Sequence, residues 1–414
     1  MHGSSRRDVL SYAAAASFLA PLRAFAQDAL PYGRAPLAGG AIDPRGDDKG
    51  TIVPPPAKDY WPYRGLSGPG RKATPAGASG GWVSGLPDVR YQGPDTPPYP
   101  LAPWGDSASG AAVIAGLLPR IRPLHDVHIR DTIVCLGGDG HYYMTGSTGD
   151  NIWAVNDGVE LWRSKDLHDW SYLGLVWSIE RDGVWERNWR MRKGVPFRAL
   201  WAPEIHFIRG NYYIVHSMSR AGVAILKSAS GRAEGPYVHA FSPEKPLRGG
   251  IDATLYDDGR TIWFTLGSAD EIVPLKDDMS GFAGPWQPMT AAEYDLDPDH
   301  HRKECAAKAY RHFGYEGATM FQRNGVHYLG VVDRYHDRYS FALWMSDKPT
   351  GPWSDRHEVP CCGGGNFLRD RDGKWWVTFF GNDSASHFRE KPGLVRIDFD
   401  AAGRVVIARE QPFA

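Results

Sequence analysis

The stretch that decides the fold is Asp131-Thr-Ile-Val-Cys-Leu-Gly-Gly-Asp-Gly-His-Tyr-Tyr-Met144, because the chain repeats its pattern. Related copies are Asp252-Ala-Thr-Leu-Tyr-Asp-Asp-Gly-Arg-Thr-Ile-Trp-Phe264 and Glu316-Gly-Ala-Thr-Met-Phe-Gln-Arg-Asn-Gly-Val-His-Tyr-Leu329. Each copy has an acidic residue, a short apolar run, a turn with glycine and an aromatic-rich run. Asn-Gly and Asp-Gly turns favour the positive φ of tight hairpins, so each copy predicts an antiparallel hairpin.

Five such hairpins follow one another from about residue 125 onward. Their turns lie at 138–140, 209–211, 257–259, 323–325 and 371–373. The spacing of roughly 50 to 70 residues is typical of propeller blades, and no long amphipathic helix pattern interrupts it. The sequence therefore predicts an all-β fold, a five-bladed β-propeller over residues 121–414.

The register of the repeat predicts that three carboxylates converge. Counting back from each turn glycine puts Asp131, Trp201, Glu316 and Gly364 at one position, and Asp252 at a position of the same parity. Side chains of a strand alternate with period two, so these residues are expected to face the axis of the ring together. Convergent carboxylates in one cleft are the groups that glycoside hydrolysis uses.

The first residues of the chain carry an export pattern. A twin-arginine pair lies within residues 5–10, an apolar run covers 12–22, and Ala24-Phe25-Ala26 matches a small-x-small cleavage site. Together they predict a Tat signal peptide over residues 1–26 and a periplasmic or secreted protein. The apolar run is too short to span a membrane.

Residues 27–120 predict an irregular N-terminal arm. They are rich in Pro, Gly and Asp, as in Pro54-Pro55-Pro56, and show little periodicity. Aromatic residues such as Trp61 and Trp82 argue against a fully disordered tail. We expect the arm to pack on the propeller or on a neighbouring subunit, where it would form a homodimer.

The amino-acid composition argues against a nucleic-acid partner and is compatible with a sugar ligand. The formal net charge of −1 leaves no basic footprint for nucleic acid. The chain has 16 Trp and 19 Tyr, and exported proteins use such rings to stack on sugars. The four cysteines are Cys135, Cys305, Cys361 and Cys362. Their spacing does not match a zinc site, and Cys305 could bridge to Cys361 or to Cys362.

Four short stretches resemble the five-bladed propellers of glycoside hydrolase family 43. They are Arg130-Asp131-Thr132, Trp201-Ala-Pro-Glu204-Ile205, Ile251-Asp252 and Glu316-Gly317, and the second is the most specific. The resemblance covers roughly residues 125 to 400. It implies that Asp131 is the general base, that Asp252 orients and tunes the acid, and that Glu316 is the general acid.

The chain departs from the family pattern at two places. Thr132 stands where the family usually has Pro, and Gly363-Gly364-Gly365-Asn366 stands where the fifth blade often has a His. A calcium ion near the axis, bound through water and a His, is common in the family. With glycine in the fifth blade, His387 is the candidate ligand for a structural calcium. The chemistry itself would need no cofactor.

The end of the chain also resembles a related group of propellers, family 117. The stretch from Phe380-Gly-Asn-Asp383 through residues 389–393 carries this resemblance. Family 117 removes 3,6-anhydro-L-galactose from agar oligosaccharides, with a His before the blade-four Glu as the acid. Here that place is Tyr315, with His312 nearby, so the acid is Glu316 or one of these neighbours.

The residues expected to bind substrate are Trp153, Trp201, Glu204, His312 and Tyr315. The expected function is exo-acting glycoside hydrolysis with inversion, releasing a sugar from the non-reducing end of an oligosaccharide. The sugar would be of the arabinofuranose, xylose, galactose or 3,6-anhydro-galactose type. The alternative is a carbohydrate-binding propeller without catalysis, which would need aromatic and amide contacts but no acid and base.

Overall fold

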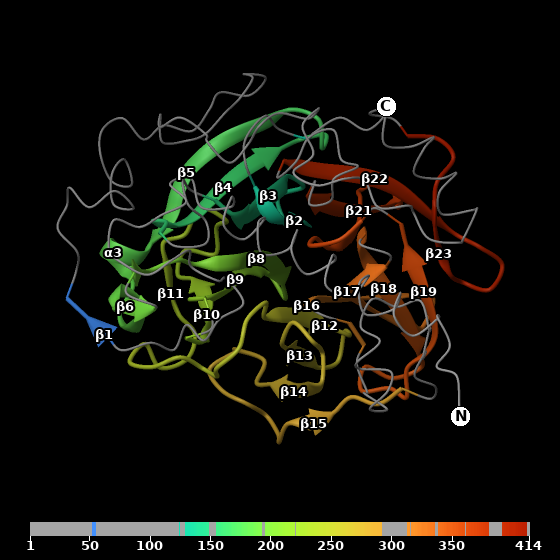
Figure 1. The fold of residues 1–414 in the computed structure, drawn as a ribbon. Coiled ribbons are helices and arrows are strands. Elements are labelled where there is room, and N and C mark those ends of the chain that lie inside the picture. Colours follow the sequence, from blue (N-terminus) through green and yellow to red (C-terminus); the bar gives the residue numbers. More distant parts are fainter. Residues whose placement is uncertain are drawn as a thin grey trace, which may run out of the picture.

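The computed structural model describes residues 52–54, 124, 129–148, 155–192, 195–219, 221–291, 313–314, 316–335, 338–360, 362–380 and 391–411. Five four-stranded antiparallel sheets form the predicted five-bladed propeller (Figure 1). In each sheet the strands follow chain order from the inside outward, and the innermost strands of neighbouring blades contact one another around a closed ring. The prediction of the fold is confirmed.

The blades have the following strands. Blade one comprises β2 (Arg130–Leu136), β3 (Tyr142–Ser147), β4 (Gly158–Ser164) and β5 (Trp170–Ser178). Blade two comprises β8 (Trp201–Ile208), β9 (Asn211–Ser217), β10 (Val223–Ser228) and β11 (Tyr237–His239). Blade three comprises β12 (Thr254–Asp257), β13 (Ile262–Thr265), β14 (Glu271–Leu275) and β15 (Gln287–Pro288). Blade four comprises β16 (Glu316–Arg323), β17 (Val326–Tyr335), β18 (Arg338–Ser346) and β19 (Ser354–Val359). Blade five comprises β20 (Phe367–Arg369), β21 (Trp375–Phe380), β22 (Pro392–Phe399) and β23 (Val405–Ile407).

The five predicted hairpins form, with loops of two kinds. In blades two and four the loops are the two residues Arg209-Gly210 and Asn324-Gly325, all four with positive φ between 49° and 84°. This is the geometry of the tight hairpin turn that the sequence predicts. In blades one, three and five the loops between the last paired residues are longer.

Apolar side chains fill the seams between blades. The described residues form five apolar clusters, and each cluster takes its members from two neighbouring blades. Inner strands therefore bury both faces, which explains near-continuous apolar runs such as Ile133-Val-Cys-Leu136. Each large side chain so buried contributes roughly 1.5–3 kcal/mol. Each blade therefore depends on its two neighbours to bury its apolar faces.

Blades one and five close the ring through side chains. The Asn366 side chain accepts from the Val134 N–H at 3.0 Å and donates to the Val134 carbonyl at 2.9 Å. The Thr378 hydroxyl donates to the Thr132 carbonyl at 2.6 Å. Among the described strands, the blade-one sheet contains only β2 to β5 and the blade-five sheet only β20 to β23. Asn366 thus supplies the donor and acceptor that a neighbouring strand would offer.

An insertion between blades one and two meets the N-terminal arm. It contains α3 (Ile179–Asp182), η3 (Trp185–Arg187), β6 (Trp189–Arg192) and β7 (Val195–Phe197). Strand β1 (Ile52–Val53) pairs with β6 at the edge of the molecule (Figure 1). Residues 52–54 are the part of the predicted arm that the structure describes. The predicted signal peptide and the predicted homodimer contact lie outside it.

Two further sequence predictions can be compared with the structure. Among the described residues, no helix has the length and apolar character to cross a membrane. Cys135 is a half-buried free thiol on β2, and Cys362 is buried. Cys305 and Cys361 lie outside the described residues, so the disulfide remains a prediction.

Candidate active site

The predicted carboxylates lie where the inner strands begin, next to a repeated irregularity of the backbone. The pairing of the two innermost strands shifts by one residue at this point in blades one, two and four. In every blade one residue at this point has a positive φ. These bulge residues are Asp131 (53°), Ala202 (41°), Asp252 (53°), Gly317 (65°) and Gly364 (66°). They define the structurally equivalent positions of the five blades.

The register predicted from the turn glycines is therefore wrong by one residue for two blades. Asp131 and Asp252 are equivalent, as expected, but Glu316 and Trp201 each precede the bulge residue of their blade. The reason is that the hairpin loops differ in length, so the turn glycine is not a fixed reference point. A bulge also places two successive residues opposite one residue of the partner strand, which breaks the simple period of two.

Asp131 is held by a buried hydroxyl. Ser147, the last residue of β3, is 2% exposed and donates from Oγ to Asp131 Oδ2 at 2.6 Å. Ser147 Oγ in turn accepts from the Ala202 N–H at 2.7 Å. The carboxylate of blade one is thereby connected to the bulge of blade two. Aspartate tolerates a positive φ better than most residues because its short side chain forms local hydrogen bonds.

Asp252 reaches the next blade directly. Its Oδ2 accepts from the N–H of Gly317, the residue after Glu316, at 3.2 Å. Gly267 leaves room for this contact, because a Cβ there would lie 3.0 Å from Asp252 Cβ and 3.3 Å from the Gly317 nitrogen. The hydrogen bond brings the start of β16 against blade three.

The electrostatics of Asp252 place the carboxylates close together. Burial raises its pKa well above the usual range of an aspartate, and the charges of Glu316 and Asp131 raise it further. The Gly317 N–H opposes this shift, and Glu204 adds to it. The charges of Glu316, Asp131 and Glu204 therefore all disfavour ionisation of Asp252, so a proton is retained at this carboxyl above the ordinary pH for carboxyl ionisation.

Glu204 is the fourth carboxylate of this region. It lies on β8, is 6% exposed, and its Oε2 is 2.9 Å from His206 Nε2. The buried charge therefore has a partner on its own strand face, since residues two apart point the same way. Trp201, at the start of the same strand, is also buried, with 6% of its surface exposed.

Asn156, two residues before β4, is anchored to blade two. The Asn156 side chain donates to the Leu200 carbonyl at 2.7 Å and accepts from the Leu200 N–H at 2.9 Å. Leu200 directly precedes Trp201, so these two hydrogen bonds tie Asn156 to the start of β8. Trp153 lies outside the described residues.

Several predicted site residues cannot be placed in this geometry. Like Trp153, the residues His312, Tyr315 and His387 lie outside the described part of the chain. Within that part, no three His, Cys, Asp or Glu side chains are grouped to hold a metal ion. Calcium at His387 thus stays a prediction from the resemblance, and no chemical step is assigned to it.

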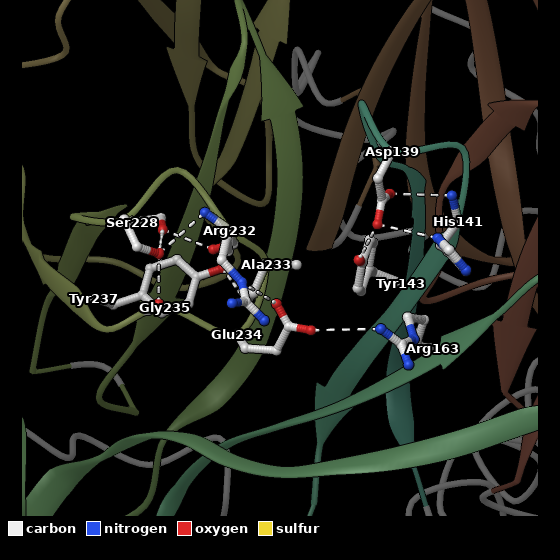
Figure 2. Close-up of polar contacts among 11 residues, drawn as sticks. Asp139, His141, Tyr143, Arg163, Ser228, Arg232, Ala233, Glu234, Gly235 and Tyr237 are labelled. Atoms are coloured by element: carbon white, nitrogen blue, oxygen red, sulfur yellow. Dashed lines mark hydrogen bonds and ion pairs between the residues drawn. The ribbon is translucent and has the colours of Figure 1, made fainter.

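A second polar cluster lies at the turn end of blades one and two (Figure 2). Asp139, in the β2–β3 turn, accepts from the Tyr143 hydroxyl at 2.7 Å and lies 3.0 Å from His141. Burial raises the pKa of Asp139, but these partners outweigh burial and the pKa is lowered. Arg163 and Glu234, 3.6 Å apart, connect the two blades nearby. This cluster is at the opposite end of β2 from the three carboxylates and belongs to the seam.

Ser147, Gly267 and Asn156 were not among the predicted site residues. For Ser147 the sequence did contain a signal, because Tyr142-Tyr-Met-Thr-Gly-Ser147 and Tyr212-Tyr-Ile-Val-His-Ser217 share one pattern. Both serines occupy the same place, opposite the residue before the bulge. Gly267 contacts Asp252 and Gly317, and Asn156 bonds to Leu200, 44 residues away. No local sequence pattern indicates contacts between residues so far apart.

Comparison with known proteins identifies the family. The model of the glycosyl hydrolases family 43 matches residues 121–405. An extracellular exo-α-(1→5)-L-arabinofuranosidase of Cellvibrio japonicus is 24% identical over 302 residues, which is 67% of this chain and 80% of the relative. A β-D-galactofuranosidase of Aspergillus niger is 29% identical over 214 residues, 46% of this chain and 53% of the relative.

Solved structures agree with the propeller fold. A family 43 enzyme from Xanthomonas citri in complex with xylotriose has a TM-score of 0.53 at 17% identity, covering 74% of this chain and 98% of that one. A β-xylosidase/α-arabinofuranosidase from a compost metagenome, in a calcium-free form, has a TM-score of 0.53 at 18% identity, with 70% and 97% covered. At these identities the likeness shows the fold alone. Because the family model spans the whole propeller, from before β2 to the last strand, the chain belongs to the glycosyl hydrolases family 43 and is a glycosidase.

Proposed function

We propose that this glycosidase removes a sugar from the non-reducing end of an oligosaccharide with inversion at the anomeric carbon. Asp131 is the general base that activates water, and Glu316 is the general acid that protonates the leaving oxygen. Asp252 orients Glu316 and sets its protonation. The observation that carries the proposal is the hydrogen bond from the Gly317 N–H to Asp252 Oδ2, which ties Asp252 to the residue after Glu316. The charges of Glu316 and Asp131, which raise the pKa of Asp252, support it.

The hydrogen bond to Asp252 favours the required distribution of protons. A backbone N–H that donates to a carboxylate stabilises its ionised form. The Gly317 N–H donates to Asp252 and opposes the rise in its pKa that burial and the charges of Glu316 and Asp131 cause. We propose that Asp252 and Glu316 share the retained proton and that Glu316 delivers it to the leaving group, as in other enzymes with paired carboxyls. Asp131, held by the Ser147 hydroxyl, stays ionised to accept a proton from water.

Stereochemistry offers the decisive experiment. Inversion requires a water between base and sugar, so we expect the Asp131 and Glu316 carboxyls to be about 6.5–9.5 Å apart when substrate is bound. Proton NMR in the first minutes of hydrolysis should show a product of inverted anomeric configuration. A product with retained configuration would refute the assignment of Asp131 as a base.

Three variants separate the roles. Asp131→Asn should abolish turnover and leave oligosaccharide binding, since it removes proton acceptance and keeps the shape. Glu316→Gln should be equally inactive on natural substrate and should recover on an aryl glycoside whose leaving group needs no proton. Asp252→Asn should lower the rate and shift the limb of the pH profile that reports the acid. Asp139→Asn is the matched control, because it makes the same change at the other end of the β2–β3 hairpin.

The substrate class is proposed from the relatives. Their names cover arabinofuranose and galactofuranose, so we propose a five-membered-ring sugar as the first candidate. Arabinan, galactofuranan, xylan and agar oligosaccharides, assayed in parallel, would rank the candidates. Release of monosaccharide alone indicates exo action, whereas a ladder of oligosaccharides would indicate endo action. A non-catalytic sugar-binding propeller would bind one of these and release nothing.

Export is proposed on two grounds. The twin-arginine segment within residues 5–10 matches a Tat signal, and relatives from Cellvibrio japonicus and Bacillus subtilis are described as extracellular. Replacing Arg6 and Arg7 by Lys should retain the protein inside the producing cell. Unchanged export of that variant would contradict Tat transport.

A further inference from the structure

The five bulges provide an internal comparison between blades. In each blade the second strand places one residue opposite the position just before the bulge. In the first, second and fourth blades the pairing identifies this residue as Ser147, Ser217 and Val332. In blade three it is Gly267, whose N–H donates to the Ile251 carbonyl. The residue at this position determines what the bulge side chain can reach.

The two bulge aspartates reach the next blade in different ways. Asp252 faces Gly267, which has no side chain, and accepts directly from the bulge N–H of blade four. Asp131 faces Ser147, and the serine takes the bulge N–H of blade two for itself. The Ser147 hydroxyl then donates to Asp131. One hydroxyl is therefore inserted between the blade-one carboxylate and the neighbouring blade.

The proton of Ser147 has a fixed direction. A hydroxyl has one proton to donate and accepts through its lone pairs. The Ala202 N–H donates into Ser147 Oγ, so the oxygen acts as acceptor toward blade two and its proton points to Asp131 Oδ2. The distance of 2.6 Å is that of a hydroxyl bonded to an ionised carboxylate, which is stronger than a neutral hydrogen bond.

We propose that Ser147 is a positioning residue for the general base. It fixes one oxygen of Asp131 and keeps the carboxylate ionised and away from the blade-two backbone, so that Asp131 faces the water that attacks the sugar. This inference rests on the proposed role of Asp131. It explains why the equivalent aspartate of blade three, which lacks the serine, lies against its neighbouring backbone instead and serves to orient the acid.

Ser217 supplies a matched control within the chain. It occupies the same place in blade two, is fully buried, and donates to the Trp201 carbonyl at 3.1 Å rather than to a carboxylate. Ser147→Ala and Ser217→Ala each remove one buried hydroxyl at equivalent positions. The Tm of each variant measures its loss of stability, so a difference in catalysis at a similar Tm isolates the contact with Asp131.

The experiment measures kcat, KM and the pH profile of both variants. Ser147→Ala should lower kcat by roughly tenfold to a hundredfold with KM little changed, since small misplacements of a catalytic group reach about a hundredfold. The acidic limb of the profile, which reports the base, should move to higher pH. Ser147→Thr keeps the hydroxyl and should recover much of the lost rate. Ser217→Ala should leave the acidic limb in place.

The outcomes distinguish this inference from the proposed function. If the wild type is active and Asp131→Asn is inactive, but Ser147→Ala behaves like Ser217→Ala, the positioning role is refuted and the general base stands. If Asp131→Asn retains activity, the proposed function fails first. In the Asp131→Asn background, which keeps oligosaccharide binding, Ser147→Ala should leave the Kd for the oligosaccharide unchanged; a tenfold weaker Kd would show that Ser147 acts on the substrate by another route.

Discussion

Acidification should destabilise the propeller through His216, which lies in the seam between blades one and two. The side chain is fully buried on β9, with its ring centroid 5.1 Å from that of Trp177 and 6.4 Å from that of Trp185. Neither ring nitrogen has a hydrogen-bond partner among the described residues. Glu186 Oε1 is 3.6 Å from His216 Nε2, but it is bonded to His239 at 2.8 Å. Protonating His216 would therefore place a second cation beside a carboxylate already paired.

The size of the effect follows from the pKa of this side chain. Burial lowers the pKa of His216 from 6.5 to about 4; His239 adds to this shift and Glu186 opposes it. Between these two pH values the unfolded chain binds a proton that the native state does not. The free energy of unfolding therefore falls as the pH falls, by up to about 1.4 kcal/mol per pH unit. Over the whole window the loss is roughly 3 kcal/mol, a large part of the ~5–15 kcal/mol that stabilises a typical domain.

Glu186 acts in a different pH range. Burial raises its pKa, but the hydrogen bond from His239 and the charges of both histidines outweigh burial, so the pKa is lowered below 4.5. A carboxyl with a lowered pKa stabilises the native state above its unfolded pKa, and this contribution disappears as the pH falls through the folded value. The stabilisation by Glu186 thus begins to be lost near pH 4.5, at the lower end of the pH range in which His216 acts.

Urea denaturation at half-unit steps from pH 7 to pH 4.5 measures the slope. His216→Phe keeps a ring between the two tryptophans and removes the titrating group. The free energy of unfolding of the variant should therefore fall less steeply with falling pH than that of the wild type, and the difference in slope should correspond to about one bound proton. His168→Gln is the control, because the His168 side chain is 69% exposed and should not affect the slope. A wild-type slope in His216→Phe would refute the reasoning.

Three further perturbations test the ring and the site. Asn366→Ala removes both hydrogen bonds to Val134 and should lower the free energy of unfolding by about 2–3 kcal/mol, measured by urea titration; a change below 0.5 kcal/mol would contradict its role in closure. Gly267→Ala adds a Cβ 3.2 Å from Asp252 Oδ2 and should lower kcat without a matching fall in Tm, an expectation that unchanged kinetics would overturn. Asn156→Ala removes both hydrogen bonds to Leu200, the residue before Trp201, and should raise KM more than it lowers kcat; an unchanged KM would contradict a role of Trp201 in substrate binding.

The sequence was sufficient to predict the propeller because the signals that define it are local. A turn such as Asn324-Gly325 specifies a hairpin through its own φ values, and five such hairpins at blade spacing leave few alternatives. Apolar runs on the inner strands then indicate burial on both faces. These features need no knowledge of distant contacts.

The register of the site could not be obtained in the same way. Whether Asp131 corresponds to Glu316 or to Gly317 depends on a bulge and on the length of the preceding loop, and both are settled by pairing with the next strand. The partners of the carboxylates come from other strands as well: Ser147 lies 16 residues from Asp131, and Gly317 lies 65 residues from Asp252. Sequence spacing predicted which acidic side chains would face one another, but their hydrogen-bond partners could be found only in the folded chain.

The closure of the ring by Asn366 has a consequence for how the protein is made. Blade five is synthesised after the other four blades, and it covers one face of blade four and one face of blade one. A nascent or truncated chain that lacks it therefore exposes two apolar surfaces at once, the kind of surface that leads to aggregation or recognition by chaperones. Since the described strands of the blade-five sheet all lie between residues 367 and 407, all five blades must leave the ribosome before the ring can close, and truncations within blade five should be cleared by proteases as readily as earlier ones.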